Sequence, residues 1–253
     1  FSKSFKNDSE TIYGITNAIC IQGLLESHKI SPNPSIYETI IAALDYYSEC
    51  RSILSDGGSY FWYSDQVTDS KQVYNVSSML AGTFARASVE LEIPGYAKIA
   101  HSAAQSIVDD VLFRENHIDW LYEKDGKRHN DLVHASYIIK GLLDTKKYLN
   151  VDYIGEKELE KYLLSFFDKD KIIREHNSID DYWLAPVLRP RSWGLGMAAF
   201  VLGEMGLKEN RDNVLDTLGL YEFESHNFSY KFGDQQHIPR SVAHILLAFS
   251  LKK

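Results

Sequence analysis

The sequence predicts an all-α protein of the α/α-toroid class, in which helical hairpins surround a central axis. Helices with polar or aromatic openings recur near Tyr13, Tyr74, Asp131, Arg191 and Pro239, at spacings of roughly 61, 57, 60 and 48 residues. Within each period a more apolar helix alternates with a more charged one. About five inner helices are therefore expected, with charged helices outside and short aromatic β-hairpin-like insertions between them. An open α-solenoid is the structural alternative.

The first pair of helices is predicted at residues 12–27 and 36–54, separated by Pro32 and Pro34. Ser35 is expected to cap the second helix. Both helices are amphipathic, and the second carries more charge on its outer face.

The later elements repeat this pattern over the rest of the chain, which is expected to form one domain spanning 1–253. Further helices are predicted at 74–91, 96–112, 131–149, 155–167, 191–206, 212–220 and from 238 onward. Extended aromatic segments are predicted at 59–65, 119–122, 180–184 and 228–233.

The helix that begins near Asp131 has the most distinctive opening. A turn at Asp125-Gly126 precedes it, and Asp131 and His134 are three residues apart, so they share a face of its first turn. The apolar body behind them has helical spacing. The sequence thus places a carboxylate and an imidazole together at the mouth of a buried helix.

The composition is that of a soluble globular chain of 253 residues, with 44% hydrophobic and 25% charged residues. The net charge of -8 argues against nucleic acid as a partner. No apolar run approaches the length of a membrane span. Sixteen tyrosines suit a protein that stacks sugars, although tyrosines also fill large helical cores.

The two cysteines, Cys20 and Cys50, belong to predicted helices and are expected to be buried thiols, with a disulfide as the alternative. No CxxC motif or Cys/His cluster indicates zinc. We therefore expect neither a metal nor a cofactor.

In a toroid the inner helices enter from one side, so their N-termini surround one central depression with their dipoles directed at it. Aromatic, carboxylate, amide and guanidinium groups at these mouths would suit a glycan, and two or three cationic groups would suit a uronate carboxylate. The candidate catalytic residues are Asp131, His134, Asp65 and Tyr74. The candidate substrate-binding residues are Trp62, Tyr63, Asn75, Trp120, Tyr122, His129, Trp183, Arg189, Arg191, Trp193, Tyr230 and Gln236.

Each candidate also has a purely structural interpretation. Asp131 could only cap its helix, His134 could be a core histidine, and Arg191 could pair with an acid of an outer helix. The tryptophans could simply pack strand against helix. Repetition of the same residue types at the same place in successive units favours the functional interpretation.

The series Trp62-Tyr63, Tyr74-Asn75, Trp120-x-Tyr122 and Asp131-x-x-His134-x-x-Tyr137, with Gly141-Leu142 behind it, carries a resemblance. It resembles the α/α-toroid proteins of bacterial exopolysaccharide and capsule gene clusters, which are similar in fold to the six-hairpin glycosidases. The resemblance covers residues 10–250 as architecture and 60–145 as motifs. It implies a role in polysaccharide synthesis or turnover in the bacterial cytoplasm or cell envelope, without choosing the compartment or the oligomeric state. The resemblance assigns no role to Tyr74 or to the Arg189-Pro190-Arg191 segment.

Two classes of function fit these residues, with carbohydrate as the partner in both. The first is a polysaccharide-processing enzyme. A hydrolase would use two carboxylates about 5 to 9.5 Å apart, for which Asp65 and Asp131 are the candidates. A uronate lyase or epimerase would need a tyrosine or histidine base, for which Tyr74, His129 and His134 are the candidates. It would also need a cation to neutralise the uronate carboxylate, and Arg191 is the candidate. The second class is a non-catalytic glycan-binding or scaffold component of a polysaccharide biosynthesis system.

A toroid cyclase of terpenes or lanthionines is disfavoured because the sequence lacks a DDxxD motif and a Cys/His zinc set.

Overall fold

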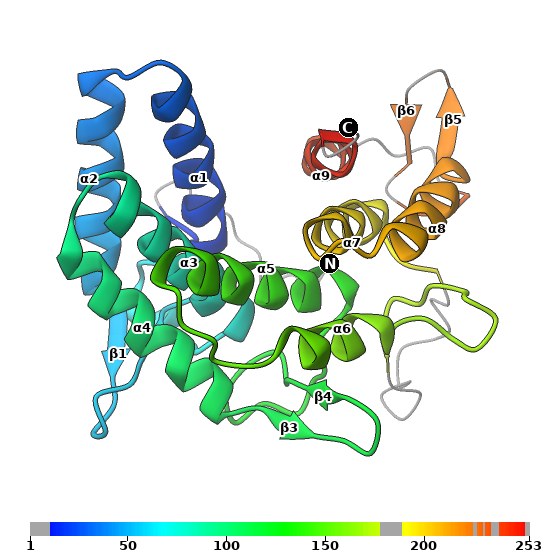
Figure 1. Ribbon diagram of the computed structural model, residues 1–253, viewed down its shortest axis with the longest axis horizontal. Helices are drawn as coiled ribbons and strands as arrows, with labels where there is room; N and C mark the ends of the chain where they lie inside the picture. Colours follow the sequence, from blue (N-terminus) through cyan, green and yellow to red (C-terminus); the bar gives the residue numbers. More distant parts are fainter. Residues whose placement is uncertain (1–10, 178–188, 225–226, 230, 234–237, 251–253) are drawn as a thin grey trace. The chain divides into compact units, whose positions relative to one another are not determined.

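The computed structural model describes residues 11–177, 189–224, 227–229, 231–233 and 238–250, which are mostly helical (Figure 1). The α-helices are α1 Gly14–Ile30, α2 Pro34–Glu49, α3 Tyr74–Glu90, α4 Pro94–Asp109, α5 Leu132–Leu149, α6 Glu156–Leu164, α7 Ser192–Glu204, α8 Lys208–Gly219 and α9 Pro239–Ser250. A 3-10 turn, η1, covers Val67–Asp69. Short antiparallel hairpins pair β1 Arg51–Ile53 with β2 Ser59–Phe61, β3 Leu112–Phe113 with β4 Ile118–Asp119, and β5 Glu222–Glu224 with β6 Asn227–Phe228.

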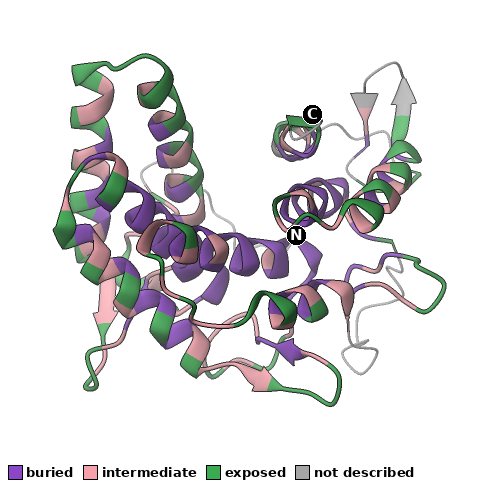
Figure 2. Ribbon diagram, viewed as in Figure 1, coloured by how far each residue is buried: buried purple, intermediate pink, exposed green. Residues whose placement is uncertain are grey.

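The order of elements follows the repeat read from the sequence. The helix pairs α1–α2, α3–α4 and α7–α8 are each followed by a short β-hairpin and then by the next helix. The predicted alternation of burial is present from α3 to α8 (Figure 2), whereas α1, predicted as an inner helix, buries one face only. Helices α3, α5 and α7 are buried along most of their length, whereas α2, α6 and α8 bury one face only. This is the amphipathic pattern that a charged outer helix requires.

The described chain divides into two compact units. The first unit comprises residues up to Asp110, together with Glu123–Asp125 and Gly141–Tyr153; the second comprises Val111–Tyr122, Gly126–Lys140 and the residues from Ile154 onward. Helix α5 contributes its C-terminal half to the first unit and its N-terminal half to the second. The predicted single domain stays a prediction.

The core of the first unit is built on α3, which packs against α1 and α4. The ring of Phe61 from β2 stacks on Phe84 of α3, with 5.2 Å between the ring centroids, and Tyr96 of α4 meets Phe84 edge-on. These aromatic pairs fix the β1–β2 hairpin against the helices.

In the second unit α7 packs against α8 and α9, and α6 packs against β4 (Figure 1). Trp120, just after β4, is fully buried and meets the ring of Tyr162 of α6 edge-on at 5.2 Å. The second unit therefore has an aromatic core of its own directly behind the mouth of α5.

Glycines allow the closest approaches between helices. A Cβ atom built on Gly141 of α5 would lie 2.1 Å from the backbone oxygen of Ser78 of α3, and one on Gly82 would lie 2.9 Å from the backbone oxygen of Gly141. A Cβ atom on Gly196 of α7 would lie 2.7 Å from the backbone of His244 of α9. Glycines of α3, α5 and α7 thus stand where the backbones of neighbouring helices approach each other most closely.

Two predicted boundaries of the second helix were wrong. Helix α2 ends at Glu49 instead of Leu54, because residues from Arg51 onward pair with β2 around a turn in which Gly57 has φ +89°. Its N-cap is Asn33, whose side chain accepts the Ser35 N–H at 2.9 Å. Pro34 at the first helical position explains this two-residue difference, since its fixed φ suits a helix start.

The cysteines are both free, and they differ in burial. Cys50 is buried as predicted, but Cys20 is exposed on α1, so the expectation of two buried thiols was wrong for one of them. Periodicity alone did not identify which face of α1 is covered.

Gly141→Ala is expected to destabilise the protein, since the new methyl group would collide with backbone atoms of α3 that cannot move independently. Overpacking of this kind costs about 1–3 kcal/mol or more, measurable by urea denaturation. Gly23→Ala is the matched control, because a Cβ atom on Gly23 of α1 meets nothing within 4 Å. The control should gain about 0.5–1 kcal/mol from helix propensity. Equal effects of the two substitutions would contradict the close approach of α3 and α5.

Candidate functional site

The mouth of α5 is positioned by the segment that precedes it. The Tyr122 N–H donates to the Arg128 carbonyl at 2.7 Å, which pairs the chain on either side of the turn. The buried Asn130 amide then donates to the backbone oxygens of Trp120 at 2.9 Å and Leu121 at 3.0 Å. These bonds tie Asn130 to the aromatic core, so Asp131, which follows it and directly precedes the helix, is held at a fixed position.

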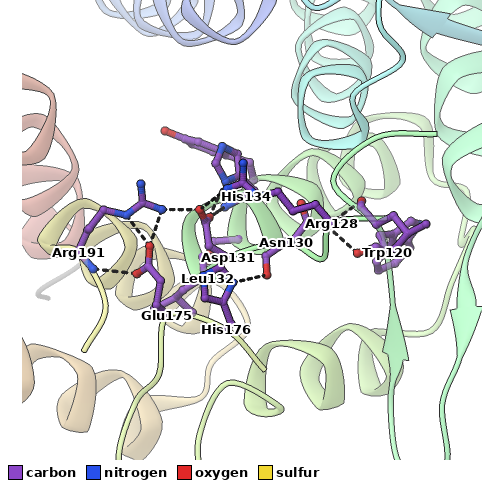
Figure 3. Close-up of polar contacts among 12 residues, drawn as sticks. Trp120, Arg128, Asn130, Asp131, Leu132, His134, Glu175, His176 and Arg191 are labelled. Atoms are coloured by element: carbon purple, nitrogen blue, oxygen red, sulfur yellow. Dashed lines mark hydrogen bonds and ion pairs between the residues drawn. The ribbon is translucent and has the colours of Figure 1, made fainter. Parts of the chain in front are cut away.

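Asp131 is the buried centre of the site, with 0% of its surface exposed. Its Oδ1 accepts the backbone N–H of His134 at 3.1 Å, which caps α5, and lies 2.5 Å from His134 Nδ1. Its Oδ2 accepts from the Arg191 guanidinium and lies 3.6 Å from Arg128 Nη2 (Figure 3). The capping role is therefore real, and ion pairs are added to it.

The contacts of Asp131 determine where the proton lies between Asp131 and His134. Burial alone would raise the pKa of Asp131, but the adjacent His134 and Arg191 and the bonds they donate hold it well below its ordinary value. The ionised carboxylate can only accept hydrogen bonds, so His134 Nδ1 carries the proton that they share. In the neutral imidazole the lone pair is then on Nε2, the tautomer that a general base needs.

Arg191 reaches Asp131 from the start of α7, where it is the N-cap residue. The segment around Glu175 lies beside the start of α5, because the Leu132 N–H donates to the Glu175 carbonyl at 2.8 Å. The carboxylate of Glu175 accepts the Arg191 backbone N–H at 2.8 Å and also accepts from the guanidinium. Arg191 therefore bridges two buried carboxyl groups (Figure 3).

The pKa values of Asp131 and Glu175 are shifted in opposite directions. Burial raises the pKa of Glu175 to about 7, and the charge of Asp131 acts in the same direction, against Arg191. One guanidinium cannot fully compensate two buried anions. Asp131 accordingly stays ionised, while Glu175 titrates near neutral pH.

The rim of the site is made by His134, Tyr122 and Arg128. The Tyr122 ring meets the His134 ring edge-on with 5.0 Å between centroids, and the Arg128 guanidinium lies 4.8 Å from the Tyr122 ring centre. The His134 side chain is 17% exposed and that of Arg128 is 54% exposed. A cation, an aromatic ring and an imidazole thus stand at the accessible edge of the cluster.

Several other predicted residues lie in the second unit. His129 Nδ1 is 2.7 Å from the buried carboxylate of Asp119. Trp193 lies under the Arg191 guanidinium at 5.0 Å, and the exposed Arg189 lies over the Phe232 ring. Trp120 was predicted to contact a substrate, but it is fully buried in the core, so its ring has no exposed face for such a contact.

Tyr74 and Asp65, both in the first unit, have environments that oppose their predicted roles. The Tyr74 hydroxyl donates to Asp110 at 2.9 Å, and burial followed by this bond raises its pKa, which is unfavourable for a base. Burial acts to raise the pKa of Asp65, but bonds from Ile12, Gln66 and Tyr46 lower it overall. An ionised Asp65 is unsuited to act as the general acid of the carboxylate pair predicted for a hydrolase.

The remaining binding candidates of the first unit are Trp62, Tyr63 and Asn75. Trp62 Nε1 donates to Ser52 at 3.0 Å, the Tyr63 ring meets Tyr13 edge-on, and Asn75 is buried in the first turn of α3. Trp183, Tyr230 and Gln236 lie outside the described residues. Convergence of all the helix mouths on one depression stays a prediction.

Sequence reasoning missed two members of the cluster, Glu175 and Arg128. Glu175 lies in an irregular segment with no periodicity, and its partner Arg191 is 16 residues away. Arg128 does carry a local signal, since it is three residues before Asp131, but a lysine-arginine pair after a turn is usually solvated.

Compared by sequence, the chain matches no protein-family model and no curated protein. Compared by structure, it resembles a D-mannose isomerase with TM-score 0.69 and 10% identity, over 96% of this chain and 72% of that one. An unsaturated glucuronyl hydrolase from Bacillus sp. GL1 has TM-score 0.69 and 12% identity, over 95% and 74% of the two chains. An alpha-amylase from Clostridium perfringens has TM-score 0.71 and 15% identity, over 96% and 71%.

The fold is that of the α/α-toroid, six-hairpin glycosidase-like enzymes. The fold class predicted from the helical repeat is thereby confirmed. At 10–15% identity the resemblance concerns the fold alone. The site must therefore be argued from its own residues.

Within the described ranges, no group of three or more His, Cys, Asp or Glu side chains is arranged to hold a metal ion. Likewise, none of the described helices is both long and apolar enough to cross a membrane.

Asp131→Asn is expected to destabilise the protein strongly. Asparagine keeps an oxygen that can cap α5. The guanidinium groups of Arg191 and Arg128, however, lose their buried counter-charge, at a cost of about 3–5 kcal/mol at neutral pH. Since the pKa of Asp131 is lowered on folding, its stabilisation is present above the ordinary value of 3.8 and is lost as pH falls below it. Urea denaturation of both proteins should therefore show their stabilities converging in acid.

Asn33→Ala is the control for this substitution, because it removes an exposed cap that has no ion pair. It should cost about 0.5–2 kcal/mol. An Asp131→Asn effect no larger than this, at any pH, would mean that the ion pairs contribute nothing.

Glu175→Gln tests the raised pKa of Glu175, which is opposite to the lowered pKa of Asp131. Folding raises the pKa of Glu175 from 4.5 to about 7, so its stabilising contribution is full below pH 4.5 and is lost as pH rises through about 7. The neutral glutamine lacks this dependence. The melting temperature of the variant relative to wild type is expected to rise between pH 5 and pH 8. A difference in melting temperature that stays constant with pH would mean that Glu175 is ionised over this whole range. The charged and titratable groups that interact with Glu175 are Arg191, Asp131 and Tyr221.

Proposed function

We propose that this chain is a carbohydrate-processing enzyme in which His134 transfers a proton to or from a carbon atom of the substrate. The observation that carries the proposal is the Asp131–His134 pair at the mouth of α5. The 2.5 Å contact from Asp131 Oδ1 to Nδ1 holds the ring in one tautomer and leaves the Nε2 lone pair for the substrate. A base oriented by a buried carboxylate is a recurrent arrangement for proton transfer.

The chemistry that suits such a base is proton abstraction beside a carbonyl or carboxylate group. This step begins the isomerisation or epimerisation of a sugar and the β-elimination of a uronate. It needs a cation near the developing enolate oxygen. Arg128 is available for that role, since it is half-exposed on the Tyr122 ring next to His134.

Glycoside hydrolysis is the competing reaction, and one observation favours it. The pKa of Asp131 is lowered and that of Glu175 is raised, the division expected of a nucleophile and a general acid. Both carboxyl groups, however, are buried and held by Arg191, with side-chain exposures of 0% and 5%. A pair that must flank a sugar bond needs access to it, so we place proton transfer by His134 first.

Glycan binding without chemistry is the remaining alternative, since the same rim could hold a sugar. Solved structures with this fold include enzymes described as an isomerase, a glucuronyl hydrolase and a polysaccharide lyase, which supports carbohydrate processing in general. A place in bacterial exopolysaccharide or capsule synthesis rests on the sequence resemblance alone and belongs to this proposal.

His134→Gln is expected to abolish carbon-proton exchange while leaving the fold intact. The wild-type protein is incubated in D2O with D-mannose, D-glucuronate and uronate oligosaccharides, and proton NMR follows the loss of C–H signals. Exchange should occur beside the carbonyl or carboxylate group of at least one substrate. Since general acid–base catalysis contributes about 10² to 10⁴ in rate, the variant should lose at least about 10²-fold.

His101→Gln is the matched control, because this exposed histidine belongs to the first unit and bonds to Tyr153. It should exchange at the wild-type rate. New reducing ends without deuterium on carbon would favour hydrolysis instead. Binding detected by calorimetry, with neither exchange nor cleavage, would favour the non-catalytic alternative.

A further inference from the structure

Glu175 presents its whole carboxylate to one residue. Its side chain is 5% exposed, its oxygens accept the backbone N–H and the Nε–H of Arg191, and it forms an ion pair with Arg191 Nη2. Contacts with three groups of a single residue fix both the position of its backbone and the plane of its guanidinium. Arg191 is also confined by the Trp193 ring beneath it.

The oriented guanidinium then acts on Asp131. Its Nη2 donates to Oδ2, while Oδ1 accepts from His134. The plane of the Asp131 carboxylate is therefore set from both sides, by Arg191 on one oxygen and by His134 on the other. Figure 3 shows the four side chains as one continuous line of contacts from Glu175 to His134.

We propose that Glu175 is a positioning residue for His134, acting through Arg191 and Asp131 to keep the imidazole in the tautomer with the proton on Nδ1. Without the Glu175 carboxylate, the guanidinium can rotate toward Asp131 alone and turn its carboxylate plane. The bond to Nδ1 then lengthens, and the neutral ring populates both tautomers. The effect on catalysis rests on the proposed function of His134, whereas the effect on the tautomer does not.

The experiment measures the His134 tautomer directly. Protein labelled with nitrogen-15 in its histidines is studied by proton–nitrogen correlation spectra that distinguish Nδ1–H from Nε2–H, and His134→Gln assigns the signal. All spectra are recorded above pH 8, where Glu175 with its pKa of about 7 is ionised, and wild type should then show the Nδ1–H form. Glu175→Gln should show a mixture of forms, and its kcat should fall by up to about 10²-fold with KM little changed, as for a misplaced catalytic group.

Arg191→Lys separates positioning from charge, because lysine keeps the charge but loses the planar fork. It should behave like Glu175→Gln. Glu209→Gln is the matched control in the same unit, since Glu209 forms an exposed ion pair with Lys171 and should change nothing. Glutamine at 175 resembles the protonated glutamate in shape, and the lysine variant provides a second folded protein for the measurement.

The outcomes separate this inference from the proposed function. A pure Nδ1–H signal in both Glu175→Gln and Arg191→Lys would overturn the positioning role, even if exchange depends on His134. A mixed signal in these variants, with no exchange by any protein including wild type, would uphold the positioning role and reject the proposed function.

Discussion

The burial of the Asp131 carboxylate is the constraint on which the second unit depends. An isolated carboxylate cannot be buried without compensation, so this one requires cations and donors on both of its oxygens. His134 comes from the same helix turn, but Arg191 must come from the start of α7. Arg191 in turn brings Glu175. One buried charge therefore connects three separate segments of the chain through Arg191 and its partner Glu175.

The parts of this arrangement that could be read from the sequence are the local ones. Asp131 and His134 are neighbours on a helix turn, so their spacing alone predicts their contact. Arg191 was singled out because it opens another helix of the repeat, although its partner could not be named. Glu175 was missed because its role follows from tertiary pairing of an irregular segment with the start of α5, and no periodic pattern encodes that pairing.

The same distinction explains the errors elsewhere. The end of α2 was misplaced because residues from Arg51 onward continue a helical pattern until the hairpin with Ser59–Phe61 overrides it. Trp120 was taken for a ligand platform because an alternating aromatic segment shows which side chains share a face, but not which face is covered. Here that face meets Tyr162 of α6, 42 residues later in the chain. The helical repeat was predicted correctly because the same pattern recurs in several successive units of the chain.

The charges around Asp131 suit the proposed proton transfer better than they suit a role in folding stability alone. A buried ion network contributes little net stability compared with apolar packing, yet this one orients an imidazole at an accessible rim. When a proton arrives on His134, its new positive charge lies 2.5 Å from an oxygen of Asp131. That carboxylate is already ionised, so the compensating charge is in place before the proton moves. Arg191 contacts both this carboxylate and that of Glu175, so little reorganisation would be left for the proposed proton transfer.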